Sequence, residues 1–150
     1  MNKPTIDSNV REIRVAATDE EILATYPVMS QLRPEIQKSD YLRIVNLQHS
    51  EVGFQVAMLT EHGRITCVAG LRVCRSLGWG KYLYVDDLVT DEQCRSKGSG
   101  KIMFDWLVEH ARALQCQELR LDSAVYRREA HRFYFRERMD IACFHFCLKL

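Results

Sequence analysis

The segment between Lys81 and Ser123 constrains the fold more than any other part of this 150-residue chain. It begins with Lys81–Thr90, KYLYVDDLVT, which is rich in the aromatic and β-branched residues that favour strands. A polar loop follows, and apolar residues then recur at helical spacing from Ile102 to Leu114. Glu118–Ser123 again has the pattern of a strand. We therefore predict a β-loop-α-β unit.

The N-terminal third of the sequence predicts one strand and two helices. Glu12–Ala16 alternates as a strand does, and Thr18–Glu21 has the S/T-x-x-E form of a capping box, which opens a helix. Helical spacing continues to Leu32, with a kink expected at Pro27. A second helix is expected over residues 35–48.

Further elements lie on both sides of the unit. Phe54–Thr60 and Arg64–Cys74 predict a strand hairpin. After the unit we expect an amphipathic helix at Arg128–Met139 and a final strand at Ile141–Leu150. The order β-α-α-β-β-β-α-β-α-β predicts an α/β (α+β) fold, and 47% hydrophobic residues suffice for one domain over residues 1–150.

Composition excludes several classes of function. With 21 Lys and Arg against 20 Asp and Glu, the chain has no broad basic field for nucleic acid or an anionic membrane. No stretch approaches the ~20 apolar residues of a membrane span, and Met1–Asn9 lacks the apolar region of a secretion signal. The six cysteines show no zinc-ligand spacing. We expect a cytoplasmic protein with reduced thiols and no metal.

The loop Arg95–Gly100 suits an anion. It leads into the helix, so the amides of residues 97–101 are helix-start donors without intrahelical partners. Gly98 and Gly100 permit close approach by a ligand, and Arg95, Lys97 and Lys101 add positive charge. A diphosphate meets these demands, although two glycines at a helix start can also simply form a turn.

Two motifs resemble a known family. RSKGSG at Arg95–Gly100, between the strand ending VDDLVT and a helix, resembles the R/Q-x-x-G-x-G/A motif of the GNAT superfamily of N-acetyltransferases. AHRFY at Ala130–Tyr134 is similar to the second motif of that family. One residue departs from the pattern, because Arg138 replaces the glycine that usually ends the helix in a left-handed conformation.

The resemblance implies a fold and a cofactor. The fold is a central mixed, mostly antiparallel sheet of about six to seven strands flanked by about four helices, with Lys81–Thr90 and Glu118–Ser123 splayed apart around pantetheine. The donor is acetyl-coenzyme A, and a homodimer is an expectation from the family. The residues expected to bind the cofactor are Leu88, Val89 and Thr90 through their backbone, and Arg95, Ser96, Lys97, Gly98, Ser99, Gly100, Lys101 and Phe133.

The resemblance places Tyr134 as the general acid that protonates the departing thiolate; without the motif it would be a core aromatic beside Phe133. Asp86 is the candidate base, since a carboxylate in a strand can orient an ammonium group and take its proton. Alternation places Asp86 and Asp87 on opposite faces. We expect Asp87 to accept backbone hydrogen bonds or pair with an arginine.

Other polar residues have ordinary explanations. Asp122 and Ser123 could line the cleft where the two splayed strands diverge, or they could form the turn before the last helix. We expect His110 and His131 to be ordinary partly exposed or core histidines. Cys94 lacks the positioned His or Asp that would activate a catalytic cysteine.

The expected activity is acetyl transfer from acetyl-coenzyme A to a primary amine by direct attack in a ternary complex. The alternative is a non-catalytic acyl-coenzyme A sensor or interaction module on the same fold. Small amines, amino acids and protein N-termini all remain open as acceptors.

Overall fold

The computed structural model describes residues 11–150, which divide into two compact units, one ending at Arg120 and one running from Leu121 to Leu150. The polar stretch Met1–Asn9 lies outside the described residues. In the part of the chain that is described, no helix is long and apolar enough to span a membrane.

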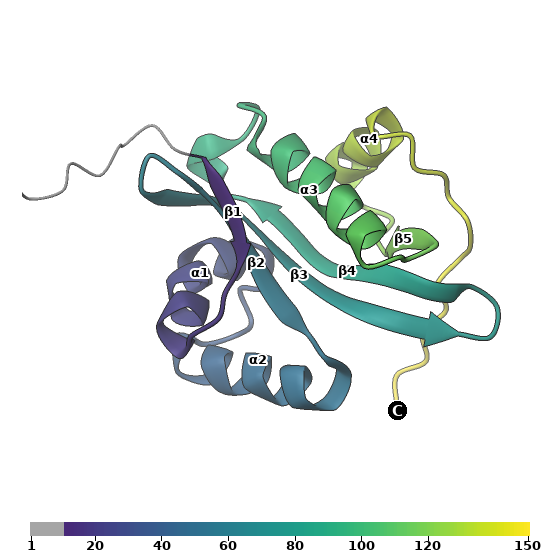
Figure 1. Cartoon of the computed structure of the whole chain (residues 1–150), viewed down its shortest axis with the longest axis horizontal. Helices are drawn as coiled ribbons and strands as arrows, with labels where there is room; N and C mark the ends of the chain where they lie inside the picture. Colours follow the sequence, from purple (N-terminus) through teal and green to yellow (C-terminus); the bar gives the residue numbers. More distant parts are fainter. Residues whose placement is uncertain (1–10) are drawn as a thin grey trace, which may run out of the picture. The chain divides into compact units, whose positions relative to one another are not determined.

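The first unit is built on a five-stranded sheet in the order β1-β2-β3-β4-β5. The first four strands pair antiparallel. Figure 1 shows α1 and α2 on one face of this sheet and α3 on the other. The elements are β1 (Glu12–Val15), α1 (Asp19–Leu32), α2 (Lys38–Val52), β2 (Gln55–Glu61), β3 (Arg64–Ser76), β4 (Gly80–Thr90), a 3-10 turn η1 (Glu92–Cys94), α3 (Ser99–Ala113) and β5 (Glu118–Leu121).

The predicted capping box forms at the start of α1. The Thr18 side chain accepts a hydrogen bond from the Glu21 amide, and the Glu21 carboxylate accepts one from the Ala17 amide at 2.7 Å. These bonds satisfy amides that have no partner within the helix. The next helix, α2, ends at Gly53, whose φ of 70° is the left-handed conformation that glycine adopts without a Cβ penalty.

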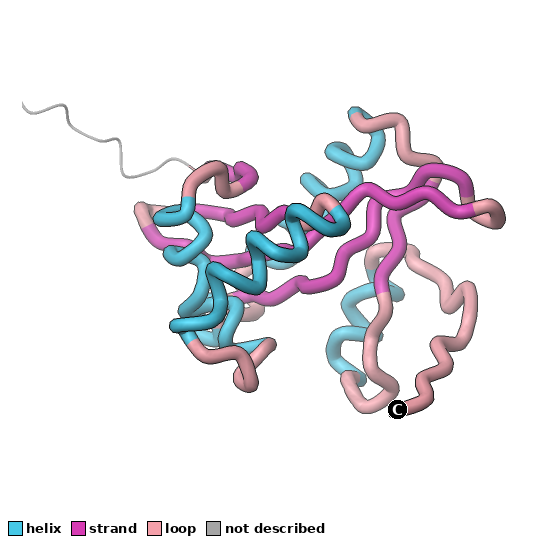
Figure 2. The backbone as a smooth tube through the Cα atoms, turned by 90° about the horizontal axis from the view of Figure 1, so that it is seen from below, coloured by secondary structure: helices cyan, strands magenta, loops and turns pink. Residues whose placement is uncertain are grey.

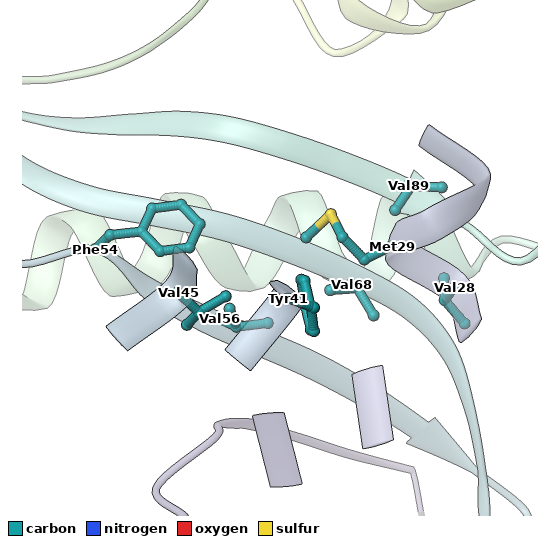
Figure 3. Packing of buried hydrophobic residues seen from close by; sticks show 8 residues of the cluster. All are labelled: Val28, Met29, Tyr41, Val45, Phe54, Val56, Val68 and Val89. Carbon is teal, nitrogen blue, oxygen red and sulfur yellow. The ribbon is translucent and has the colours of Figure 1, made fainter. Parts of the chain in front are cut away.

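A hydrophobic cluster joins α1 and α2 to the sheet (Figure 3). The hydroxyl groups of Thr25 and Tyr41 are hydrogen-bonded at 2.8 Å within it, linking the two helices. On the opposite face, α3 buries Met103 and Leu107. The cluster consists of Val28, Met29, Tyr41, Val45, Phe54, Val56, Val68 and Val89.

The second unit contains α4 (Arg128–Arg136), which ends three residues earlier than predicted. The predicted strand at Ile141–Leu150 is wrong: these residues form no strand, and Figure 2 draws them as loop. Phe144 and Phe146 are exposed there. Alternation defines a face, but a strand also needs a hydrogen-bonded neighbour, and the pattern itself does not supply one. The sheet accordingly has five strands instead of six or seven.

Candidate active site

A β-bulge in β4 arranges the two adjacent aspartates. Gly70 of β3 lies opposite Asp87 and Leu71 lies opposite Val85, so Asp86 is the extra residue of the bulge. The prediction that alternation places the aspartates on opposite faces is therefore wrong. Without the extra residue, Asp87 would share a face with Val85, which is only 3% exposed. The bulge turns Asp87 away from that apolar face.

Asp87 forms an ion pair at the end of α1. Its carboxylate accepts a hydrogen bond from Nε of Arg33 at 2.7 Å, and its side chain is 10% exposed. Burial raises the pKa of Asp87 above its ordinary value, although the charge and hydrogen bond of Arg33 act in the opposite direction. A Cβ on Gly70 would lie 2.4 Å from a carboxylate oxygen of Asp87, so only glycine leaves room for this carboxylate. The expectation that Asp87 pairs with an arginine is confirmed.

Asp86 pairs with a different arginine. Nε of Arg72, on β3, lies 2.9 Å from one carboxylate oxygen of Asp86 and 3.2 Å from the other. The Arg72 guanidinium also lies over the ring of Tyr84, 5.0 Å from its centroid. Both members of the Arg72–Asp86 pair remain about a quarter to a third exposed. Asp86 is thus held in a fixed position and stays within reach of solvent and ligands.

The second half of β4 extends beyond its neighbour β5. The Gln117 amide donates to the carbonyl of Lys81 at 2.7 Å, so β5 begins near the start of β4. Four residues cover roughly 13 Å, and β4 has eleven. The short strand β5 therefore cannot pair with β4 along its whole length, and the half of β4 from the bulge to Thr90 extends beyond it. The side chain of Val89 is committed to the core, so this residue can offer a cofactor only its backbone.

Asp91 fixes the chain as it leaves β4. Its carboxylate accepts hydrogen bonds from Arg64 at 2.5 Å and from the Gln93 amide at 3.1 Å. From α1, the side chain of Gln31 accepts a hydrogen bond from the Glu92 amide at 2.9 Å. The loop that follows therefore starts from a position defined by both β3 and α1.

The start of α3 has the geometry of an anion cradle. Gly98 is the N-cap residue with a φ of 92°, no side chain caps the helix, and a Cβ built on Gly98 meets no atom within 4 Å. The first intrahelical bond goes from the Ile102 amide to the Gly98 carbonyl, which leaves the preceding amides as donors. Gly100 has a different role, because its Cβ would lie 3.1 Å from the Thr90 hydroxyl. The open space and the uncapped amides fit a diphosphate.

Ser99 anchors the loop to the sheet. Its hydroxyl donates to the carboxylate of Glu61 at 2.6 Å, and Thr66 donates to the same oxygen at 2.7 Å. Burial raises the pKa of Glu61, but these two hydrogen bonds and the nearby Arg11 outweigh it, so the pKa lies below its ordinary value. The hydroxyl of Ser99 is therefore occupied by the protein, and its amide is the part that can face a ligand.

The basic residues of the loop differ in their contacts. Among the described residues, Arg95 donates a long hydrogen bond of 3.5 Å from Nε to the Thr90 carbonyl. Lys97 donates to the Gln93 carbonyl at 3.1 Å, and Lys101 pairs with Asp105 at 2.8 Å. Ser96, between the first two, has a φ of 61°.

In the second unit, Phe133 and Tyr134 lie together on α4, with ring centroids 5.6 Å apart. Although Arg138 replaces the usual glycine, the residue has a φ of 63°, and the Met139 amide donates to the Tyr134 carbonyl at 3.0 Å. This is the bonding of a glycine-type C-cap, with arginine in the left-handed position.

Two other polar side chains of this unit have partners within the unit. A ring nitrogen of His131 lies 2.9 Å from the Ala124 carbonyl, and Asp122 lies 2.9 Å from His145. His131 therefore has a structural contact, in line with the ordinary role expected for it.

Sequence reasoning missed Arg33 and Arg72, which hold the two aspartates. Their partners are 54 and 14 residues away along the chain, and no local motif marks such pairs. All six cysteines are free. Among residues 11–150, no group of three His, Cys, Asp or Glu side chains could hold a metal ion.

Comparisons with known proteins place this geometry in context. The model of the acetyltransferase (GNAT) family matches residues 15–139. The uncharacterized N-acetyltransferase YhdJ of Bacillus subtilis (strain 168) is 35% identical over 115 residues, 77% of this chain and 81% of that protein.

Two solved structures are similar in fold. A ribosomal-protein-alanine N-acetyltransferase from Brucella melitensis biovar Abortus 2308 has a TM-score of 0.79 at 13% identity, covering 94% of this chain and 99% of the other. A glucosamine-6-phosphate N-acetyltransferase from Arabidopsis thaliana has a TM-score of 0.71 at 19% identity, with the same coverage.

Proposed function

The chain belongs to the acetyltransferase (GNAT) family, and we propose that it transfers an acetyl group from acetyl-coenzyme A to a primary amine by direct attack in a ternary complex. One observation carries the proposal: the second half of β4 has the paired aspartates of the bulge at one end and leads, at the other, to the uncapped start of α3. The family match crosses the boundary between the two units, which supports a single catalytic domain.

The cofactor binds along this half of β4. Backbone groups of Leu88, Val89 and Thr90 pair with pantetheine where β5 is too short to pair. The pyrophosphate binds at the start of α3, to the amides that follow Gly98 and to the loop cations. Arg95, Ser96, Lys97, Gly98, Ser99, Gly100 and Lys101 form this site, and Phe133 contacts the cofactor from α4.

Acetyl-coenzyme A supplies an activated acetyl thioester, and the residues of the chain handle the protons. An alkyl ammonium with a pKa near ~10 must lose a proton before it can attack. Asp86 orients this ammonium and takes its proton, directly or through water, because Arg72 fixes the carboxylate while leaving it partly exposed. The amine nitrogen then bonds to the carbonyl carbon and the carbon–sulfur bond breaks. Tyr134 protonates the thiolate, and the second proton lost by the acylated nitrogen restores the Tyr134 hydroxyl. The proton taken by Asp86 passes to solvent, so the reaction releases one proton overall.

Replacing Tyr134 with Phe tests the acid. We expect kcat to fall about 10²-fold or more, while the Kd for acetyl-coenzyme A stays nearly unchanged. Thiol release measured over a panel of amines gives kcat, and isothermal titration gives Kd. Tyr126→Phe is the matched control, since Tyr126 is 81% exposed on the same unit.

Two results would contradict the proposal. Equal turnover of Tyr134→Phe and the wild type would remove Tyr134 from the mechanism. Tight binding of acetyl-coenzyme A without thiol release on any amine would instead favour the non-catalytic sensor or interaction module.

A further inference from the structure

We propose that the acceptor is a small amine that also carries a carboxylate close to the amine, and that Arg72 binds this carboxylate. The inference rests on the proposed function and names the class of acceptor for that same site. It is drawn from the contacts of the bulge, which lie entirely within the first unit.

The guanidinium group of Arg72 has hydrogen-bond donors that are available to a ligand. Its hydrogen bonds within residues 11–150 are both made by Nε, to the two oxygens of Asp86. The two terminal NH₂ groups donate to no described residue, and the side chain is 31% exposed. The ring of Tyr84 supports one face of the guanidinium at 5.0 Å. A planar guanidinium held in this way presents the fork that binds carboxylates with two parallel hydrogen bonds.

Arg33 is not available for this role. It donates to the Asp87 carboxylate at 2.7 Å and, through a terminal nitrogen, to the Asp86 carbonyl at 3.2 Å. Its two contacts fix the bulge itself. Arg33 is therefore a positioning residue, and Arg72 is the cation that can turn to a ligand.

The charges around the bulge fit a zwitterion better than a polycation. Asp86 and Asp87 are each matched by an arginine, and Glu35 is the further acidic group that acts on Asp87. A polyamine needs several carboxylates that are not already paired with a cation, and here both carboxylates of the strand are paired with an arginine. A dianionic phosphate would face two aspartates, whereas a singly charged carboxylate has the geometry of the fork.

The distances also set the spacing within the acceptor. Asp86 and Arg72 are in direct contact at 2.9 Å. A ligand whose ammonium binds Asp86 and whose carboxylate binds the outer nitrogens of Arg72 must have its two charges a few atoms apart. Amino acids with the carboxylate next to the amine meet this requirement, and diamines and amino sugar phosphates do not.

The test compares alanine with alaninamide, which lacks the carboxylate charge. We expect the wild type to prefer alanine in kcat/KM, and Arg72→Gln to lower this preference about 10- to 100-fold, the range typical of charge-assisted hydrogen bonds. The loss should appear as a higher KM for alanine. The two amines differ in pKa, but that difference is the same for both enzymes and cancels in the ratio of preferences.

Two further variants keep the test decisive. Arg72→Lys retains the charge without the fork and should give an intermediate preference, and it carries the test if Arg72→Gln does not fold. Arg75→Gln removes an exposed arginine from the same strand and should leave the preference unchanged.

The outcomes separate this inference from the proposed function. If the wild type acetylates alaninamide, putrescine or glucosamine 6-phosphate with a kcat/KM equal to that for alanine, the inference is overturned but amine acetylation stands. An unchanged preference in both Arg72 variants overturns it as well. An absence of thiol release on every amine of the wider panel overturns the proposed function, and the inference with it.

Discussion

Replacing Arg33 with Ala should destabilise the protein in a way that depends on pH. The substitution removes the cation that pairs with Asp87, whose side chain is only 10% exposed. A buried carboxylate without a partner keeps the cost of desolvation and loses the compensating attraction. The substitution of Arg33 also removes the hydrogen bond from Arg33 to the Asp86 carbonyl.

The magnitude follows from the burial of each partner. Breaking a fully buried pair by removing one member costs about 3–5 kcal/mol, and the 41% exposure of Arg33 places this pair below that range. We expect a loss of about 2–3 kcal/mol at pH 7.5, which corresponds to a decrease in Tm of roughly 5–10 °C for a chain of this size.

The pH dependence has a definite sign. Burial raises the pKa of Asp87 in the folded state, so the folded protein binds this proton more tightly than the unfolded chain. Stability therefore falls as pH rises from the unfolded pKa through the folded pKa. Without Arg33 the folded pKa rises further, and the penalty grows. The difference between variant and wild type should be larger at pH 7.5 than at pH 4.5.

Urea unfolding at both pH values measures the effect. Arg43→Ala is the control, because Arg43 is 68% exposed and lies 3.4 Å from an exposed Asp40. An Arg33→Ala loss no greater than that of the control, or one that is equal at both pH values, would refute the assignment of Asp87 as a buried carboxylate that depends on Arg33.

Two other substitutions test backbone positions by thermal unfolding. Gly70→Ala should cost about 2 kcal/mol, since its Cβ would meet Asp87 at 2.4 Å and the Phe54 ring at 2.6 Å, whereas Gly78→Ala has open space and should be nearly neutral. Arg138→Gly should stabilise α4 by about 1 kcal/mol, because Arg138 has a φ of 63°; a destabilisation would show that the arginine side chain makes contacts worth more than the strain.

Local patterns predicted most of the fold. The capping box at Thr18, the aromatic strand β4 and the helical spacing of α3 are each encoded within a few neighbouring residues, and all three are confirmed. The prediction of a final strand is wrong because alternation is a local pattern, whereas the pairing of a strand depends on residues far away along the chain. A sequence can show that Phe144 and Phe146 would share a face, but not which strand would pair beside them.

The site was predictable to a similar depth. Gly98 carries its own signal, since glycine permits the positive φ that the structure has at this position. Ser99 looked equivalent to its neighbours in the loop, yet its hydroxyl is bound by Glu61, 38 residues away. The roles of Arg33 and Arg72 depend on contacts of the same long-range kind.

The bulge shows why stability and activity should be coupled at this site. A regular β4 would place Asp87 on the apolar face with Leu83 and Val85, where an ionised carboxylate would lack compensation. The extra residue resolves this conflict and at the same time brings Asp86 and Asp87 within reach of two arginines. Substitutions that disturb the bulge from a distance, at Gly70 or Arg33, should therefore alter acceptor binding as well as stability. Substitutions at the far end of the strand, around Gly98, should alter cofactor binding alone.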